Sequence, residues 1–220
     1  MKGLFITGTD TGIGKTWFTV ACIRALQESG LKVAAMKPIA SGADMIDGQL
    51  RNDDAQQIQQ ALNYPVKYEE INPYCFSPPV SPHIAAEEAG VDIDLNKIQK
   101  LLIDLNTNAD FSLVEAVGGW LAPLSEQLTV ADLATKLDLP VLMVVGVRLG
   151  CLNHAMLTLE SIHKSGVVFA GWVANMLEPD LPEMDKQLDY LTRHLEMPPL
   201  VQMGWATEPN FCVDSFISQT

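Results

Sequence analysis

One stretch near the amino terminus limits the possible folds more than any other: Gly8-Thr9-Asp10-Thr11-Gly12-Ile13-Gly14-Lys15-Thr16. A short apolar run, residues 4–6, precedes it, and apolar side chains recur at helical spacing in residues 17–26. This order of strand, glycine-rich turn and helix predicts a phosphate-binding loop, because small residues let backbone N–H groups converge and the helix adds its dipole. Lys15 would bring a positive charge to the outer phosphates, and Thr16 a hydroxyl ligand for Mg²⁺.

The loop departs from the usual motif in its length. Counting back from Lys15 and Thr16, the standard spacing places the first glycine at position 9, where this chain has Thr9. The chain's own glycine is Gly8, so the loop is one residue longer. The alternative is an ordinary glycine-containing turn with a surface lysine. The strand and helix patterns on either side favour the phosphate loop.

The composition limits the class of partner. Hydrophobic residues make up 48% of the 220 residues and charged residues 19%, which is typical of a globular chain rather than a disordered one. The formal net charge of −13 argues against nucleic acid or an anionic membrane as partner, because both need a basic face. We expect a single domain over residues 1–220.

The spacing of the cysteines and the hydropathy of the chain indicate the cellular compartment. Cys22, Cys75, Cys151 and Cys212 are widely spaced and form no Cys-x-x-Cys pair, so neither a zinc site nor a disulfide framework is predicted. No secretion signal and no run of about 18 apolar residues is visible. We therefore expect a cytoplasmic protein with reduced thiols.

Strand and helix patterns alternate along the rest of the chain. Strands are expected at residues 33–36, 111–115, 140–146, 168–175 and 200–203, and helices at 15–29, 52–63, 84–88, 95–106, 130–137, 153–165 and 182–196. Residues 39–51 and 64–82 are expected to be loops. The alternation predicts an α/β fold of the single-domain P-loop NTPase-like type, with a mainly parallel sheet flanked by helices on both faces.

Polar residues and glycines gather where the predicted strands end. Lys37 follows one strand, Glu115 ends another, and Asn175 ends a third. Because ligands bind at the carboxyl ends of parallel strands, we expect these side chains and the phosphate loop to share one site. Glu115 is costly to bury unless it faces a cation, so a place in the Mg²⁺ shell is its expected role. Asp54 would serve equally well as a helix cap, and Lys37 as a surface lysine.

Several motifs occur together in a fixed order. Besides the phosphate loop they are Lys37-Pro38-Ile39-Ala40-Ser41-Gly42, Arg51-Asn52-Asp53-Asp54-Ala55, Asn72-Pro73-Tyr74, Ser81-Pro82-His83, Val114-Glu115, Gly118-Gly119-Trp120 and Val145-Gly146-Val147-Arg148-Leu149-Gly150-Cys151-Leu152-Asn153-His154-Ala155. In this combination the chain resembles the dethiobiotin synthetase family, in which the longer phosphate loop is usual. The similarity extends to Gly171-Trp172-Val173-Ala174-Asn175 and thins after that.

The resemblance implies an ATP- and Mg²⁺-dependent carboxylation and ring closure. Members of the family convert 7,8-diaminopelargonate, CO₂ and ATP to dethiobiotin, ADP and phosphate. One amine takes up CO₂ as a carbamate, the carbamate oxygen attacks the γ-phosphoryl group, and the second amine displaces phosphate. Such chemistry depends on positioning and charge neutralisation rather than on a protein nucleophile.

The resemblance also implies a role for each matching residue. Those expected to bind the nucleotide are Gly8, Asp10, Thr11, Gly12, Ile13, Gly14, Lys15 and Thr16 of the loop, with Asn175 and Gly204 near the adenine. Those expected to be catalytic are Lys15, Lys37 and Thr11, and those expected to surround Mg²⁺ are Thr16, Asp54 and Glu115. Those expected to contact the substrate are Ser41, Gly118, Gly150, Cys151, Leu152 and Asn153.

In the family the helix that begins near residues 150–153 comes from a second subunit. The resemblance therefore implies a homodimer with shared sites, in which free N–H groups at this helix start bind the substrate carboxylate. We also expect Lys37→Ala to lower turnover and leave folding unchanged.

Two alternatives to this function stay open. Ala116-Val117 replaces a glycine-containing turn after Glu115, and Gln187 falls where a carboxylate-binding tyrosine is expected, so the first alternative is a catalytically weakened paralogue. A regulatory ATPase of the partition or septum-positioning type shares the broader fold, but it usually carries a signature lysine early in the loop, where this chain has residues 9–11.

Overall fold

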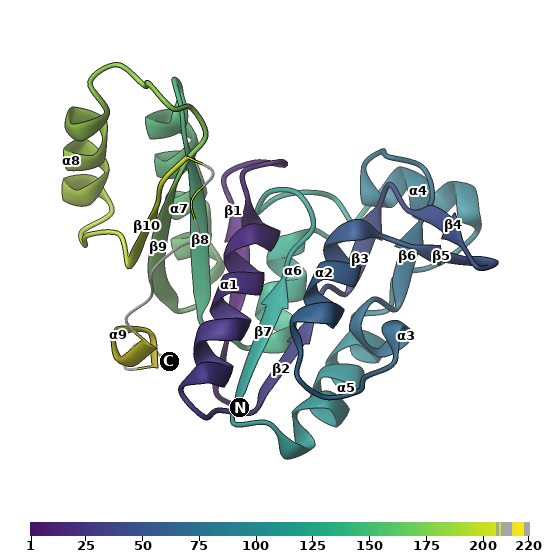
Figure 1. The fold of residues 1–220 in the computed structure, drawn as a ribbon. Helices are drawn as coiled ribbons and strands as arrows, with labels where there is room; N and C mark the ends of the chain where they lie inside the picture. Colours follow the sequence, from purple (N-terminus) through teal and green to yellow (C-terminus); the bar gives the residue numbers. More distant parts are fainter. Residues whose placement is uncertain (206, 208–212, 218–220) are drawn as a thin grey trace.

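Six strands form the main sheet of the chain, which we describe from a computed structural model covering residues 1–205, 207 and 213–217, without the side chains of residues 214 and 215 (Figure 1). The strands are β1 (Gly3–Gly8), β2 (Val33–Met36), β7 (Phe111–Glu115), β8 (Val141–Val147), β9 (Phe169–Met176) and β10 (Val201–Met203). Their order in the sheet is β10-β9-β8-β1-β7-β2, and every pairing is parallel. The expected α/β fold with a parallel sheet is confirmed.

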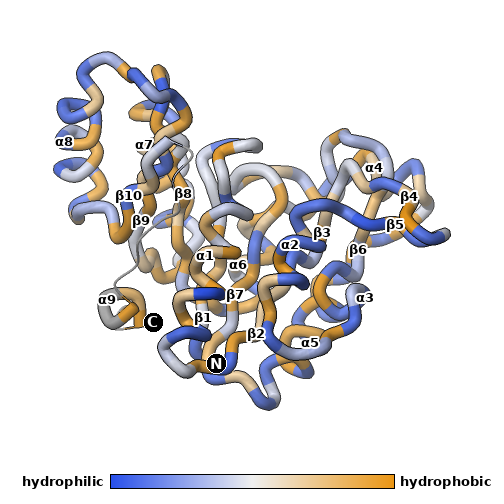
Figure 2. The backbone as a smooth tube through the Cα atoms, in the orientation of Figure 1, coloured by the Kyte–Doolittle hydropathy of each residue, from blue (hydrophilic) through white to orange (hydrophobic). Residues whose placement is uncertain are grey.

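Helices cover both faces of the sheet. One face carries α1 (Lys15–Glu28), α2 (Asp53–Ala61), α3 (Tyr68–Ile71) and α9 (Val213–Ile217); the other carries α4 (Pro82–Ala89), α5 (Leu95–Leu105), α6 (Val130–Leu137), α7 (Cys151–Ser165) and α8 (Met184–His194). Side chains alternate between these faces, since Leu4 and Ile6 of β1 lie in one hydrophobic core and Phe5 in the other. Figure 2 shows the hydrophobic strands of the sheet between the helices.

Helix boundaries follow local capping. The Asn52 side chain accepts a hydrogen bond from the Ala55 N–H and begins α2, and the Asp94 side chain does the same for α5 through the Asn96 N–H. The first residues of α1 follow Gly14, which has a positive φ of 84°. Asp54 is therefore not the cap of α2, and its carboxylate is left available for another partner.

Two segments expected to be loops contain short elements. Residues 39–51 form β3 (Ile39–Ser41), β4 (Asp44–Ile46) and β5 (Gln49–Arg51), and residues 64–82 include α3 and β6 (Tyr74–Phe76). Strand β3 pairs with β6, and β4 with β5. Strands of three residues are too short to show a period-two pattern, so tertiary pairing rather than local sequence defines them.

Several boundaries also differ from expectation. Helix α4 begins at Pro82 instead of residue 84, and α7 begins at Cys151 instead of residue 153, directly after Gly150 with φ 95°. Helix α9 was not expected. No helix among the described residues is both long and apolar enough to cross a membrane. Cys212 lies outside the described residues, and the extent of the domain, residues 1–220, stays a prediction.

Candidate active site

Short polar contacts join the carboxyl ends of β2 and β7 to the first turns of α1 and α2. The Lys37 Nζ lies 2.6 Å from Glu115 Oε1 and 2.8 Å from Asp54 Oδ2. The Thr16 hydroxyl donates to the same Glu115 oxygen at 2.7 Å. Four residues predicted as site residues from separate parts of the sequence therefore meet at one point.

The charges in this cluster shift the pKa values of Lys37 and Asp54. Burial disfavours the charged form of Lys37, but the adjacent Glu115 and Asp54 carboxylates hold its pKa above the usual value. Burial acts in the opposite direction on Asp54, yet Lys37 and the Thr16 hydroxyl hold the pKa of that carboxyl below its usual range. Lys37 is therefore an ammonium group at neutral pH, and its side chain is only 4% exposed.

Lys15 lies close to this cluster of charged groups. Its Nζ donates to the backbone oxygen of Asp10 at 3.0 Å. Burial, together with the neighbouring positive charge of Lys37, lowers the pKa of Lys15 to about 8. The ammonium form is present at neutral pH and gains from any anion that reaches it.

The loop backbone is held against the end of β9. The Asn175 Nδ2 donates to the Ile13 oxygen at 2.7 Å. A Cβ at Gly14 would collide with this same Asn175 amide, and Gly14 also has φ 84°, so both the space and the backbone conformation require glycine there. The contact places Asn175 beside the loop.

The phosphate loop and the Lys37–Glu115 pair line one cavity of about 380 Å³. The predicted site residues that line it are Thr11, Gly12, Gly14, Lys15, Thr16, Lys37, Ser41, Asp54, Glu115 and Gly118. Three further lining residues, Trp17, Gln57 and Val117, were not predicted as site residues.

The sequence does contain signals for two of these three residues. Gln57 could have been found because it lies one helical turn after Asp54 on α2, and Trp17 because it directly follows Thr16. Val117 is one of the departures noted in the sequence, and it lines the cavity.

Other predicted residues lie outside the lining of this cavity. Gly8, Asp10 and Ile13 belong to the loop backbone or its outer side, Asn175 contacts the loop from β9, and Gly204 follows β10. The predicted carboxylate site, Gly150, Cys151, Leu152 and Asn153, forms the start of α7. There the Cys151 thiol approaches the Gln187 side-chain oxygen at 3.7 Å, so Gln187 does occupy the neighbourhood in which a tyrosine was expected.

The donor set around Glu115 fits a magnesium ion. Glu115 is fully buried, and its second oxygen, Oε2, has no hydrogen-bond partner. With the Thr16 hydroxyl and the Asp54 carboxylate it offers only hard oxygen atoms, as Mg²⁺ prefers. No group of three or more His, Cys, Asp or Glu side chains in the described part of the chain is placed to hold a metal ion. Any Mg²⁺ held here would take its remaining ligands from water or phosphate oxygens.

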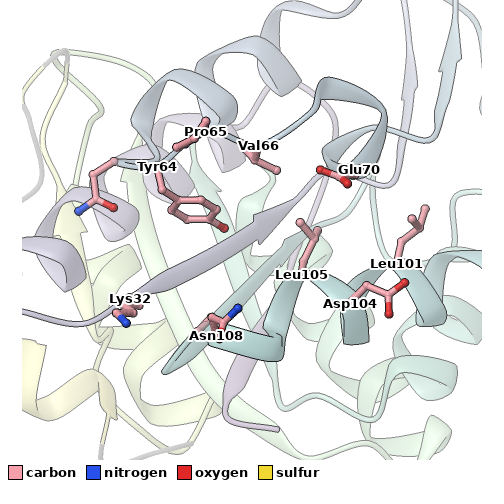
Figure 3. A pocket seen from close by; sticks show the side chains of 11 residues that line it. Lys32, Tyr64, Pro65, Val66, Glu70, Leu101, Asp104, Leu105 and Asn108 are labelled. Atoms are coloured by element: carbon pink, nitrogen blue, oxygen red, sulfur yellow. The ribbon is translucent and has the colours of Figure 1, made fainter.

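A larger cavity, of about 630 Å³, lies at the opposite end of the sheet (Figure 3). It is formed by the segment before β2, the turn after α2 and the end of α5, with Lys32, Tyr64 and Leu105 among its lining residues. Of its charged lining residues, Lys32 and Asp104 are exposed and Glu70 is half-buried, and the lining contains neither a glycine-rich turn nor a buried charge. Its chemistry gives no reason to place the active site there.

Comparison with known proteins agrees with this geometry. A family described as an AAA domain matches residues 2–206. An ATP-dependent dethiobiotin synthetase BioD from Aromatoleum aromaticum is 44% identical over 90% of this chain and 88% of its own. Another, from Pseudomonas paraeruginosa, is 43% identical over 90% and 87%. The chain belongs to the dethiobiotin synthetase family.

Solved structures share the fold of this dethiobiotin synthetase family member at low identity. The MinC:MinD cell division protein complex of Aquifex aeolicus matches with a TM-score of 0.59 and 18% identity, over 100% of this chain and 86% of that chain. The signal recognition particle receptor FtsY of Elizabethkingia anophelis, in complex with GDP, matches with a TM-score of 0.55 and 13% identity, over 99% of this chain and 63% of that chain. Family membership confirms the resemblance found in the sequence; the roles of individual residues stay predictions.

Proposed function

We propose that the chain catalyses the ATP- and Mg²⁺-dependent conversion of 7,8-diaminopelargonate and CO₂ to dethiobiotin, ADP and phosphate. The observation that carries the proposal is the cavity at the end of the glycine-rich loop, where Lys15 and Lys37 face Glu115 and Asp54. Two buried cations beside a phosphate-binding loop suit a reaction in which negative charge develops on a phosphoryl group and on the oxygen attacking it.

We expect the reaction to proceed in three steps. One substrate amine attacks CO₂ and loses a proton, which gives a carbamate. The carbamate oxygen attacks the γ-phosphorus of ATP, the bond to the bridging oxygen breaks, and ADP leaves. The second amine then attacks the carbonyl carbon, phosphate leaves with the carbamate oxygen, and the loss of a proton completes the cyclic urea.

The residues of the cavity serve these steps by binding and orientation. Lys37 neutralises the carbamate and the transferred phosphoryl group, and Lys15 and Thr11 bind the outer phosphates. Thr16, Asp54 and Glu115 would hold Mg²⁺, which when bound offsets phosphate charge. The hydroxyl group of Ser41, a buried atom with no hydrogen-bond partner, is available to a substrate amine or carbamate, as is the backbone at Gly118.

The nucleotide base and the substrate carboxylate bind beyond the lining of the phosphate cavity. Asn175 and Gly204 contact the adenine. The carboxylate binds the free N–H groups of Gly150, Cys151, Leu152 and Asn153 at the start of α7. The α7 start lies outside the lining of the phosphate cavity, which supports the proposal that a second subunit supplies it and that the enzyme is a homodimer.

Exposed apolar side chains support a dimer formed through α7. Leu149, just before this helix, is 87% exposed, and Leu157 on the helix is 58% exposed. Large apolar side chains in this position favour burial against another protein surface. We place the enzyme in the cytoplasm, where Cys22, Cys75 and Cys151 would stay reduced thiols, as they are here.

The direct test is product formation. Purified protein is incubated with 7,8-diaminopelargonate, bicarbonate, ATP and Mg²⁺, and dethiobiotin is measured by mass spectrometry alongside ADP. We expect equal amounts of dethiobiotin and ADP. ADP without the ring product, or nucleotide binding without turnover, would contradict the proposed function.

The dimer is tested separately by Leu157→Asp, which places a charge on the exposed face of α7. We expect a shift from dimer to monomer in light scattering, with loss of turnover because the α7 contribution to the site is removed. The matched control is Val168→Asp, at another exposed apolar position of similar exposure that lies before β9. A dimeric, active Leu157→Asp variant would contradict an interface through α7.

A further inference from the structure

Arg148 connects the segment after β8 to the outer side of the phosphate loop. Its guanidinium nitrogen Nη2 lies 2.6 Å from Asp10 Oδ2, although the two residues are 138 positions apart in sequence. Arg148 is the first residue after β8, and Asp10 is the second after β1, so the contact joins the ends of two neighbouring strands. Nothing in the roles proposed above uses Arg148.

Asp10 in turn contacts the two loop residues that we propose bind the phosphates. Its Oδ1 accepts a hydrogen bond from the Thr11 N–H at 2.7 Å, and its backbone oxygen accepts from Lys15 Nζ at 3.0 Å. One aspartate therefore fixes the backbone at Thr11 and the resting position of the Lys15 side chain. Any movement of Asp10 would displace both.

Few other contacts of the described residues hold residues 10–12 of the loop in place. Thr11 and Gly12 are exposed, and a Cβ at Gly12 would meet nothing within 4 Å. On either side, Thr9 N–H bonds to the Val144 oxygen at 3.1 Å and the Ile13 side chain is buried. The residues between these two anchors include the one by which this loop exceeds the usual length. The Arg148–Asp10 pair is a side-chain contact that ties this span to the end of β8.

We propose that Arg148 is a positioning residue, which holds the lengthened loop in its phosphate-binding conformation through Asp10. The inference rests on the proposed function for its effect on turnover, but its effect on phosphate binding can be measured alone. A half-exposed ion pair adds little to global stability, so the expected effect is on loop order rather than on unfolding.

The test is a double-mutant cycle on the full chain, with ATP–Mg²⁺ and inorganic tripolyphosphate as probes in calorimetry. We expect Arg148→Ala to raise the Kd for both probes about tenfold, the scale of one charge-assisted hydrogen bond, with an unchanged Tm. Asp10→Asn should give a similar loss, and the double variant should be no worse than Asp10→Asn alone. Arg148→Lys should recover most of the affinity, because a lysine also supplies a cation there.

Two results would overturn the proposal. Unchanged affinity for both probes in Arg148→Ala would show that the pair does not position the loop. Losses that multiply in the double variant would show that Arg148 acts on phosphate directly and not through Asp10. The matched control is Arg193→Ala, at an exposed arginine on α8, which should leave both affinities unchanged.

Failure of this inference is distinguishable from failure of the proposed function. If the unmutated protein binds ATP but forms no dethiobiotin, the proposed function is wrong. The Kd values of the double-mutant cycle would still show whether Arg148 positions the loop. If dethiobiotin forms normally and Arg148→Ala changes neither affinity nor KM for ATP, the function stands and the role of Arg148 is refuted.

Discussion

The two ends of the main sheet carry cavities of different kinds. The cavity at the carboxyl ends of the strands measures about 380 Å³ and is lined by the buried side chains of Lys37 and Glu115. The cavity at the amino ends is larger, about 630 Å³, and is lined by exposed or half-buried residues such as Tyr64 and Leu105 (Figure 3). Volume alone would not select the cavity in which we propose the active site.

The difference follows from the direction of parallel strands. At the carboxyl ends the chain turns from strand to helix, so glycine-rich turns, free helix N–H groups and strand-end side chains converge. At the amino ends α2 and α5 finish and the chain returns to the sheet. The short helix α3 begins beside the cavity, but no glycine-rich turn precedes it. Lys37 and Glu115 are buried together because each neutralises the charge of the other, whereas the buried Lys15 has a backbone oxygen as its hydrogen-bond partner.

The largest effect is expected from Lys37→Ala at the carboxyl end. Removing this preorganised charge should lower turnover at least about 100-fold. The structure changes our expectation for folding, because Glu115 is fully buried and would lose the cation 2.6 Å from it. We now expect a loss of about 3–5 kcal/mol in the free energy of unfolding. Steady-state kinetics and chemical denaturation would measure the two effects.

A compensating variant separates these effects. In Lys37→Ala combined with Glu115→Gln, the buried charge is gone, so most of the stability should return while turnover stays low. If turnover returned together with stability, the Lys37 charge would be structural only, and the contrast between the two ends of the sheet would lose its main support.

An intermediate effect is expected from pH, through Lys15. Its pKa is about 8 in the free protein, and bound phosphate should raise it, so ATP binding above pH 8 requires proton uptake. Affinity should be fully present below pH 8 and fall by up to about tenfold for each pH unit above it. Calorimetry at pH 8.5 in two buffers of different ionisation enthalpy would measure the proton taken up.

The control for this pH effect is a residue that stays charged. Lys15→Arg should abolish the proton uptake, whatever it does to affinity, because arginine does not titrate in this range. Lys164→Arg, at an exposed position of α7, should leave the uptake unaltered. Equal uptake in the Lys15→Arg variant and the natural sequence would assign the proton to another group.

The smallest effect is expected at the amino-end cavity. Tyr64→Ala removes its aromatic wall, and we expect kcat and KM to stay within about twofold, as for other surface substitutions. A fivefold change in either constant would mean that this cavity communicates with the active site, and the comparison between the two ends would have to be revised.

Sequence reasoning found the parts of the site that depend on local pattern and topology. The phosphate loop was recognised from its glycines and flanking elements, and Lys37 and Glu115 from their places at strand ends, although 78 residues separate them. Asp54 remained ambiguous because three adjacent residues could each cap α2. The structure resolves this, since Asn52 is the cap and Asp54 faces Lys37.

Contacts that depend on side-chain reach were not predictable. The Arg148–Asp10 pair requires β8 to lie beside β1, and no periodicity in the sequence gives that order. The three-residue strands between residues 39 and 76 exist through pairing with each other, which local propensity does not encode. Val117 was noted as a departure in sequence, but its position in the cavity wall became visible only in the fold.

The pairing of Lys37 with Glu115 and Asp54 bears on how nucleotide reaches the enzyme. With Lys15, the cluster contains two positive and two negative groups that cancel, whereas the whole chain carries a formal charge of −13. At a distance the molecule repels a polyanion, and attraction by the lysines begins only at close range. Capture of ATP should therefore become faster as salt rises, and Mg²⁺-bound ATP should arrive sooner than the free anion.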